Sequence, residues 1–140
     1  MNPVRSFLQA NEAAKVMDRT PETIARLGQI VPPERPAGGK GYRAAYSFRN
    51  LIEMRIVEEM VKFGVPRKKI ALYVTQLRVS MNRWLDGHDD GWMVIDGQWN
   101  WQITSNFDAI QLGWRNKKPD AFLAISIGKI KSELAEKFPE

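Results

Sequence analysis

Residues 38–47 read GGKGYRAAYS, and residues 48–63 continue as FRNLIEMRIVEEMVKF. In the first stretch, closely spaced glycines stand beside basic and aromatic residues, a composition typical of a hairpin loop with a flexible basic tip. In the second stretch, apolar residues from Leu51 to Phe63 recur at helical spacing. We therefore predict a basic hairpin that leads directly into a long apolar helix.

The ends of this helix and the start of the next are also marked. Ser47 is suited to cap the long helix, and Gly64 is suited to stop it just after Phe63. Pro66 is expected to begin a further helix that runs as far as Trp84. Residues 67–69, Arg-Lys-Lys, stand at its start, and two interpretations of them stay open: a contact with phosphate and a solvated charged turn.

Two shorter helices are expected upstream of the hairpin. Residues 6–10 can form a brief strand or an extended lead-in, after which Asn11 is expected to cap a helix over 11–17, NEAAKVM. A second helix is predicted over 20–27, TPETIARL, with Thr20 as its cap and Pro21 at its first position. It is expected to end near Gly28.

The second short helix has one apolar and one polar face. Ile24 and Leu27 are expected to point inward, and Thr23 and Arg26 outward. Two short helices joined by a tight turn form a helix-turn-helix, in which the second helix enters the major groove of DNA. The basic hairpin that follows is then expected to be a wing.

Composition excludes several classes of function. The chain of 140 residues has no cysteine and one histidine, His88, which leaves little with which to build a catalytic triad or a metal site. We expect no enzymatic activity, no catalytic residue, no metal and no cofactor. No apolar run is long enough for a membrane span or a secretion signal, so a cytoplasmic, nucleoid-associated protein is expected.

Charge is unevenly distributed along the chain. Residues 1–84 contain 15 Lys and Arg against 7 Asp and Glu, a balance of +8, whereas residues 85–140 have a balance of −3. A basic segment suits a polyanion, because neutralisation of phosphates supplies much of the affinity for nucleic acids. This distribution favours DNA as the partner of the first segment.

A change of pattern marks a boundary near Asp86. Residues 86–91, DGHDDG, are expected to form a turn between a domain over 1–85 and a smaller segment over 86–140. Strands are predicted over 92–95, 98–103 and 121–127, with a hairpin turn at Asp96-Gly97, followed by a helix over 129–138. The expected fold class is α+β: four helices and a wing hairpin, then a small β-rich segment and a C-terminal helix.

Four of the five tryptophans lie between Trp92 and Trp114, and three roles are ranked for them. Filling the core of the small sheet comes first, with Trp99, Trp101 and Ile103 on one face of a strand. A self-association surface that makes the protein a homodimer comes second. A pocket for a flat apolar small-molecule effector comes third.

The first half of the chain resembles the DNA-binding domain of the MerR-like regulators. The resemblance rests on an ordered series of segments over residues 6–77: NEAAKVM, TPETIARL, PPER, GGKGYRAAYS and NLIEMRIVEEMVKFGVPRKKI. It implies a winged module that binds operator DNA as a dimer. Tyr42 and Arg43 match wing residues of the family, and Arg26 is suited to guanine or phosphate. The residues expected to contact DNA are Lys15, Arg19, Thr20, Thr23, Arg26, Lys40, Tyr42 and Arg43.

The chain also departs from that family. Ala25-Arg26-Leu27 replaces an Arg-Tyr-Tyr run, Ala44-Ala45 replaces one residue of the wing, and the long dimerisation helix is missing. The leading hypothesis is a transcription regulator that binds double-stranded DNA. The alternative is a recombination accessory protein of the excisionase type, which binds and bends DNA, and the short recognition helix favours it.

Overall fold

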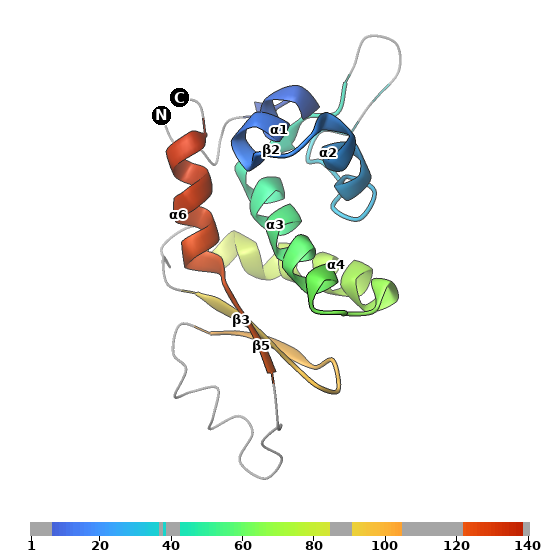
Figure 1. Ribbon diagram of the computed structural model, residues 1–140, viewed down its shortest axis with the longest axis vertical. Coiled ribbons are helices and arrows are strands. Elements are labelled where there is room, and N and C mark those ends of the chain that lie inside the picture. Colours follow the sequence, from blue (N-terminus) through green and yellow to red (C-terminus); the bar gives the residue numbers. More distant parts are fainter. Residues whose placement is uncertain (1–6, 37, 39–42, 85–90, 105–121, 139–140) are drawn as a thin grey trace.

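The computed structural model describes residues 7–36, 38, 43–84, 91–104 and 122–138, with backbone only for 80–84. This part of the chain has a mixed α+β fold with five helices and two small antiparallel sheets, so the predicted α+β class is confirmed (Figure 1). In chain order the elements are β1 (Phe7–Leu8), α1 (Ala10–Met17), α2 (Pro21–Leu27), β2 (Tyr46–Ser47), α3 (Phe48–Lys62), α4 (Arg67–Trp84), β3 (Trp92–Asp96), β4 (Trp101–Thr104), β5 (Phe122–Ser126) and α6 (Ile127–Lys137).

The helix α1 begins one residue earlier than the cap predicted at Asn11. Gln9 is the N-cap, and its backbone N–H donates to the Glu12 carboxylate at 3.1 Å. The prediction at Asn11 is therefore wrong, because an acidic side chain three residues after Gln9 already satisfies the start of the helix. Asp18 ends α1 in the left-handed conformation, with φ of 57°.

The ends of α2 and α3 agree with the predictions. The Thr20 hydroxyl accepts a hydrogen bond from the Thr23 backbone N–H, with Pro21 at the first helical position, and Gly28 follows the last residue of α2. The Ser47 hydroxyl caps α3 in the same way, accepting from the Asn50 N–H at 3.1 Å. Gly64 has φ of 83°, a conformation that glycine adopts without steric cost.

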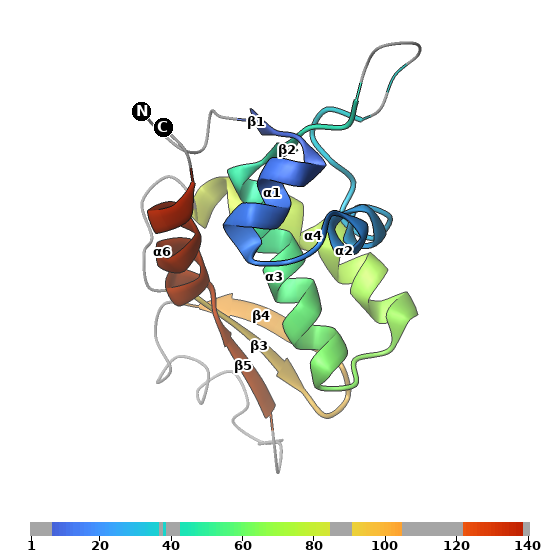
Figure 2. The ribbon, with the colours of Figure 1, turned by 45° about the horizontal axis from the view of Figure 1, so that its top comes forward.

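The helix α3 is the centre of the molecule. In Figure 2 it lies between α6 on one side and α2 and α4 on the other, with the three-stranded sheet beneath it. Its apolar side chains are fully buried on more than one face: Leu51, Ile52, Met54, Ile56, Val57 and Met60. A helix that is apolar around most of its circumference is an interior helix, which explains the long apolar run in the sequence.

The C-terminal sheet has the strand order β4-β3-β5, and all its pairs are antiparallel. Met93 of β3 lies opposite Ile103 of β4 and Ile125 of β5. The hairpin from β3 to β4 is longer than Asp96-Gly97 predicts, because its connection spans residues 97–100 and β4 begins at Trp101. The Asp96 carboxylate accepts from the backbone N–H groups of Gln98 and Asn100, both at 2.9 Å, and so stabilises the wider turn.

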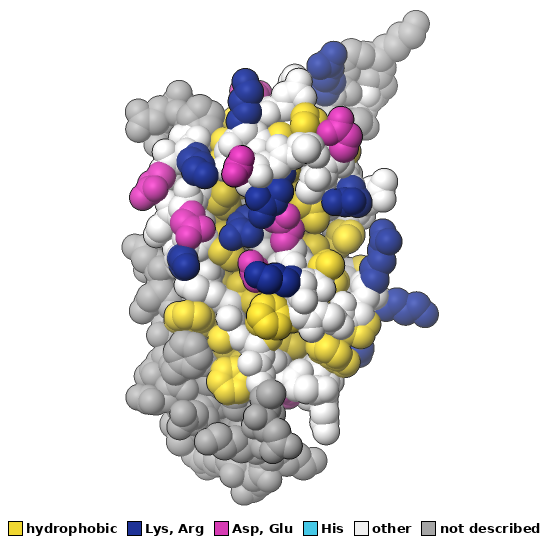
Figure 3. Space-filling view, in the orientation of Figure 1, with side chains coloured by type: hydrophobic (Ala, Val, Ile, Leu, Met, Phe, Trp, Pro, Cys, Tyr) yellow, Lys and Arg dark blue, Asp and Glu magenta, His cyan; other side chains and the backbone are white. Residues whose placement is uncertain are grey.

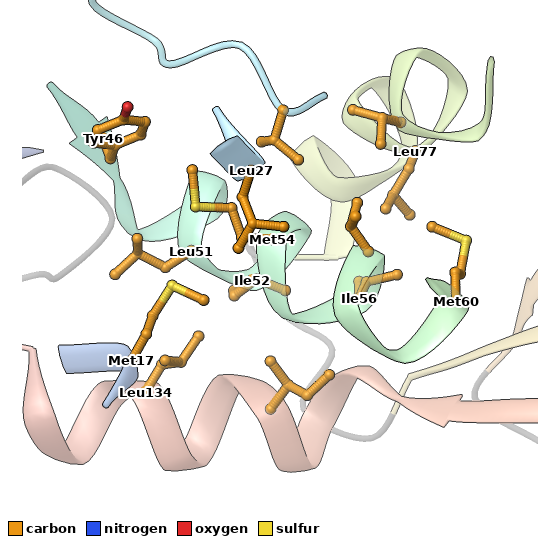
Figure 4. Packing of buried hydrophobic residues seen from close by; sticks show 14 of the residues in the cluster. Met17, Leu27, Tyr46, Leu51, Ile52, Met54, Ile56, Met60, Leu77 and Leu134 are labelled. Carbon is orange, nitrogen blue, oxygen red and sulfur yellow. The ribbon is translucent and has the colours of Figure 1, made fainter. Parts of the chain in front are cut away.

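The C-terminal helix completes the core of the N-terminal helices. α6 begins at Ile127, two residues before the predicted start, because the Ser126 hydroxyl accepts from the Lys129 N–H. The rings of Phe48 and Phe138 stack with centroids 5.3 Å apart, and Figure 4 shows Leu134 of α6 facing α3 beside Met17. The segments 1–85 and 86–140 thus share one hydrophobic cluster.

Among the described helices, none has both the length and the apolar character that crossing a bilayer requires.

Candidate nucleic-acid interface

The outer face of α2 presents polar side chains. Ile24 and Leu27 are buried, as predicted, whereas Arg26 is exposed and Thr23 is half-buried. Arg26 makes no ion pair with any described residue. The Thr20 and Thr23 hydroxyl oxygens lie 3.0 Å apart, and Thr20 also accepts the Thr23 backbone N–H. Thr20 therefore fixes the start of α2, and the Arg26 side chain is exposed to solvent on its outer face.

Arg19 lies in the turn between α1 and α2, and its guanidinium forms hydrogen bonds with other groups of the protein. Its Nε donates to Glu58 Oε2 at 2.8 Å, and its Nη1 donates to the carbonyl oxygens of Met17 and Asp18. The hydrogen bond to Glu58 raises the pKa of Arg19 above its ordinary value, against the opposing effect of partial burial, so the cation persists. This contact ties the turn to α3 and sets where α2 begins.

The partner of Arg19 could not be found from the sequence. Glu58 lies 39 residues further along the chain, in the middle of α3. No local signal links the two residues, because the pair forms only when α1 and α3 pack.

The base of the hairpin is well defined. Arg35 and Ala45 exchange two backbone hydrogen bonds, of 3.2 and 2.8 Å, and β1 pairs with β2 beside them. The Arg35 guanidinium lies over the Phe7 ring, 4.0 Å from its centroid. Glu34 forms an ion pair with Arg49 of α3. The described residues on both sides of the hairpin lead away from the helices at the top of Figure 1.

Arg43 follows the hairpin tip and lies two residues before Ala45. Its side chain is exposed and makes no ion pair with the described part of the chain. Lys15 of α1 is likewise exposed and has no ion-pair partner among those residues. Lys40 and Tyr42, the other two predicted contacts, lie outside the described residues, as does His88 with most of the predicted turn at 86–91.

Cations with and without carboxylate partners both occur among the described residues. Ion pairs are made by Arg19, Arg49, Arg55 and Arg78. Within the described ranges, exposed cations without an ion pair lie on α1, α2 and the hairpin base and also at the connection between α3 and α4: Lys15, Arg26, Arg35, Arg43, Lys62, Arg67, Lys68 and Lys69. Figure 3 shows acidic and basic side chains interleaved near the centre of one face, with further basic ones projecting at its edge. Unpaired cations are the ones available to an anionic partner.

The two fully described tryptophans near the sheet connection pack against α4. Trp101 donates its indole N–H to Gln76 Oε1 at 2.7 Å and lies against the Tyr73 ring, with centroids 6.0 Å apart. The Tyr73 hydroxyl donates to the Trp99 carbonyl oxygen. Trp99, Trp101 and Ile103 all contact the hydrophobic cluster, which favours the role in the core that was ranked first.

The described surface also has hollows away from α2. Two hollows there lie beside α6, one lined by Met17, Arg19 and Lys137 and one by Phe63, Leu123 and Ile130, and no tryptophan lines either. A search of the described residues for three or more acidic, His or Cys side chains gathered as metal ligands found none.

No model of a known protein family matches the chain, and a search of curated proteins found no match either.

Proposed function

We propose that this protein is a DNA-binding transcription regulator of the MerR-like type, with α2 in the major groove and the hairpin on the phosphate backbone. The observation that carries the proposal is the exposed Arg26, which has no ion-pair partner among the described residues and lies on the outer face of a helix whose start is fixed by Thr20 and Arg19. Arginine at such a position is suited to guanine or phosphate.

The dimensions of α2 fit this role. Seven residues make about two turns of helix, and an α-helix with its side chains is about 10–12 Å in diameter, which fits a major groove about 12 Å wide. α2 can therefore present roughly two turns to the bases, with Thr23 and Arg26 on the exposed side. Arg43, two residues before the paired base of the hairpin, would neutralise a phosphate next to that groove.

Dimerisation belongs to the same proposal. Regulators with this module bind two half-sites about one helical turn apart, so a homodimer is the expected working form. Contacts with DNA remain predictions for Lys15, Arg19, Thr20, Lys40 and Tyr42. For Arg19, we propose that the side chain positions α2 through Glu58 rather than touching bases. The protein then acts at the nucleoid as a binding module and not as an enzyme.

The experiment that tests the proposal is Arg43→Ala in the full chain. Duplex affinity, measured by fluorescence anisotropy with a labelled mixed-sequence duplex, should fall about tenfold, and the dependence of log K on log salt should lessen by about one. The thermal transition should not move, because the side chain is exposed and unpaired. Lys137→Ala, an exposed cation on α6, is the matched control.

An unchanged affinity in Arg43→Ala would show that the hairpin is not a wing. Strong binding of the wild-type chain with no dependence on salt would count against a phosphate partner altogether.

An excisionase-type accessory protein is the second candidate, and the short α2 is the observation that favours it. Such a protein acts together with an integrase, whereas a regulator acts at a promoter. The neighbourhood of its gene separates the two: an adjacent integrase gene supports the accessory protein, and a divergent promoter supports the regulator.

A further inference from the structure

A charged residue lies fully buried where the hairpin joins α3 and α4. Glu53 of α3 has no solvent exposure. Its carboxylate accepts three hydrogen bonds: from Asn50 Nδ2 at 3.1 Å, and from Arg78 Nε and Nη2, both at 3.2 Å. The two bonds from Arg78 form a bidentate pair, which fixes direction as well as distance. A buried carboxylate held in this way defines one geometry for its neighbours.

The same two partners hold the segment that leads into the hairpin. Arg78 Nη2 donates to the Pro32 carbonyl oxygen at 2.6 Å, and Asn50 Nδ2 approaches the same oxygen at 3.4 Å. Asn50 Oδ1 accepts from the Glu34 backbone N–H at 2.9 Å. Residues 32 and 34 are therefore anchored on both sides of Pro33, immediately before the Arg35–Ala45 pair that closes the hairpin.

Asn50 also anchors the other strand of the hairpin. Its Oδ1 accepts from the N–H of Ser47, the last residue of β2, at 3.0 Å. One buried amide thus holds both chain segments that enter and leave the hairpin, and Glu53 with Arg78 orients that amide. A buried network in which these polar groups are all hydrogen-bonded favours one arrangement of the chain segments that it holds.

We infer that Asn50, Glu53 and Arg78 are positioning residues that set the direction of the hairpin, and with it the placement of Arg43 on a phosphate. This inference rests on the proposed function and adds to it the residues that fix the direction of the wing. The alternative is that the buried network contributes only to the stability of the α3–α4 pair. The two hypotheses differ in what a conservative substitution in the network changes: the backbone hydrogen bonds of the hairpin base and DNA binding, or only the stability of the fold.

The test is Arg78→Lys in the full chain. Lysine keeps the positive charge beside Glu53 but lacks the planar fork, so it cannot reproduce the bidentate geometry in which Arg78 holds both Glu53 oxygens and the Pro32 carbonyl oxygen. The matched control is Arg55→Lys, an arginine of α3 with similar exposure that pairs with Glu58, Glu59 and Glu133 instead. Both variants are compared with wild type at a temperature where all are folded.

The first readout is amide hydrogen exchange without DNA. We expect faster exchange at Arg35 and Ala45 in Arg78→Lys, with no change at Ile24 of α2 or at Gly28, which follows α2. Unchanged exchange at Arg35 and Ala45 overturns the inference.

The second readout is a double-mutant cycle on the same mixed-sequence duplex. Arg78→Lys and Arg43→Ala should each weaken binding about tenfold, and the double variant should be weaker by about tenfold as well, because a misaimed hairpin has already lost the Arg43 contact. Independent losses that multiply to about a hundredfold overturn the positioning role. If Arg43→Ala alone has no effect, the proposed function fails, and the exchange data still show whether the network holds the hairpin.

Discussion

At the scale of the single residue, Gly28 illustrates how a close contact selects a side chain. Its φ is −62°, so the backbone does not require glycine. A Cβ at this position would lie 2.9 Å from the Tyr46 hydroxyl oxygen and 3.3 Å from the carbonyl oxygens of Ile24 and Ala25. The end of α2 therefore requires a residue without a side chain at position 28, because the Tyr46 side chain packs against the backbone there.

Gly28→Ala should lower the free energy of unfolding by about 1 kcal/mol. Overpacking costs about 1–3 kcal/mol, which exceeds the gain of about 0.5–1 kcal/mol that alanine brings by restricting the unfolded chain. Tyr46→Phe removes the nearest atom, so the double variant should recover part of the loss in urea titrations. Strict additivity of the two substitutions would mean that the hydroxyl contact is not the cause.

Tyr73 gives the protein a dependence on alkaline pH. Burial, followed by the nearby Asp96 charge, raises the pKa of Tyr73 above its ordinary value of 10.0. A phenol with a raised folded-state pKa contributes fully to stability below the unfolded-state value, and this contribution is lost as the pH rises through the folded-state value. The free energy of unfolding should therefore fall above about pH 10, and less steeply in Tyr73→Phe. Identical alkaline profiles for the two proteins would disprove this origin.

At the scale of the element, local signals predicted the helices well. Thr20, Pro21, Ser47 and Gly64 act through bonds or backbone angles within a few residues, so the starts and stops they mark are correct. The turn after β3 was predicted wrongly although its cause is also local, because the Asp96 carboxylate binds N–H groups two and four residues further on and so selects a wider turn than Asp96-Gly97 alone favours.

The residues of the candidate site also divide into those that local sequence could predict and those that it could not. The inward and outward faces of α2 follow from helical periodicity and could be predicted. The Arg19–Glu58 and Glu53–Arg78 pairs could not, since they join residues 39 and 25 positions apart. Nothing in the sequence near Glu53 predicts that it is buried, because a carboxylate can be buried only with partners that the fold brings to it.

Ser47→Ala should cost about 1 kcal/mol by removing the cap of α3. The hydroxyl is buried and accepts the Asn50 N–H, which would then be left without a partner. Ser47→Thr keeps the acceptor and serves as the control in chemical denaturation. An alanine variant as stable as wild type would show that this cap is dispensable.

At the scale of the whole molecule, the strand-and-helix segment at the C-terminus completes the core beneath the proposed DNA-binding elements. α6 packs on α1 and α3, and Arg55 of α3 reaches Glu133 of α6 at 3.9 Å. One shared hydrophobic cluster predicts one cooperative unfolding transition for the chain.

Phe138→Ala should lower the free energy of unfolding by about 3 kcal/mol, because the ring is buried and stacks on Phe48. Phe63→Ala, at a ring that is 59% exposed, should change it by less than about 1 kcal/mol. Far-UV circular dichroism and tryptophan fluorescence should report the same midpoint. Two separate transitions would contradict a single core.

The central claim, that α2 reads DNA, is tested most directly by selecting duplexes from a random pool with the full chain. The account predicts one enriched motif, arranged as two symmetric half-sites, that is lost when Thr23 and Arg26 are both replaced by alanine. Sequences indistinguishable from the starting pool, or the same motif recovered by the doubly substituted protein, would contradict it.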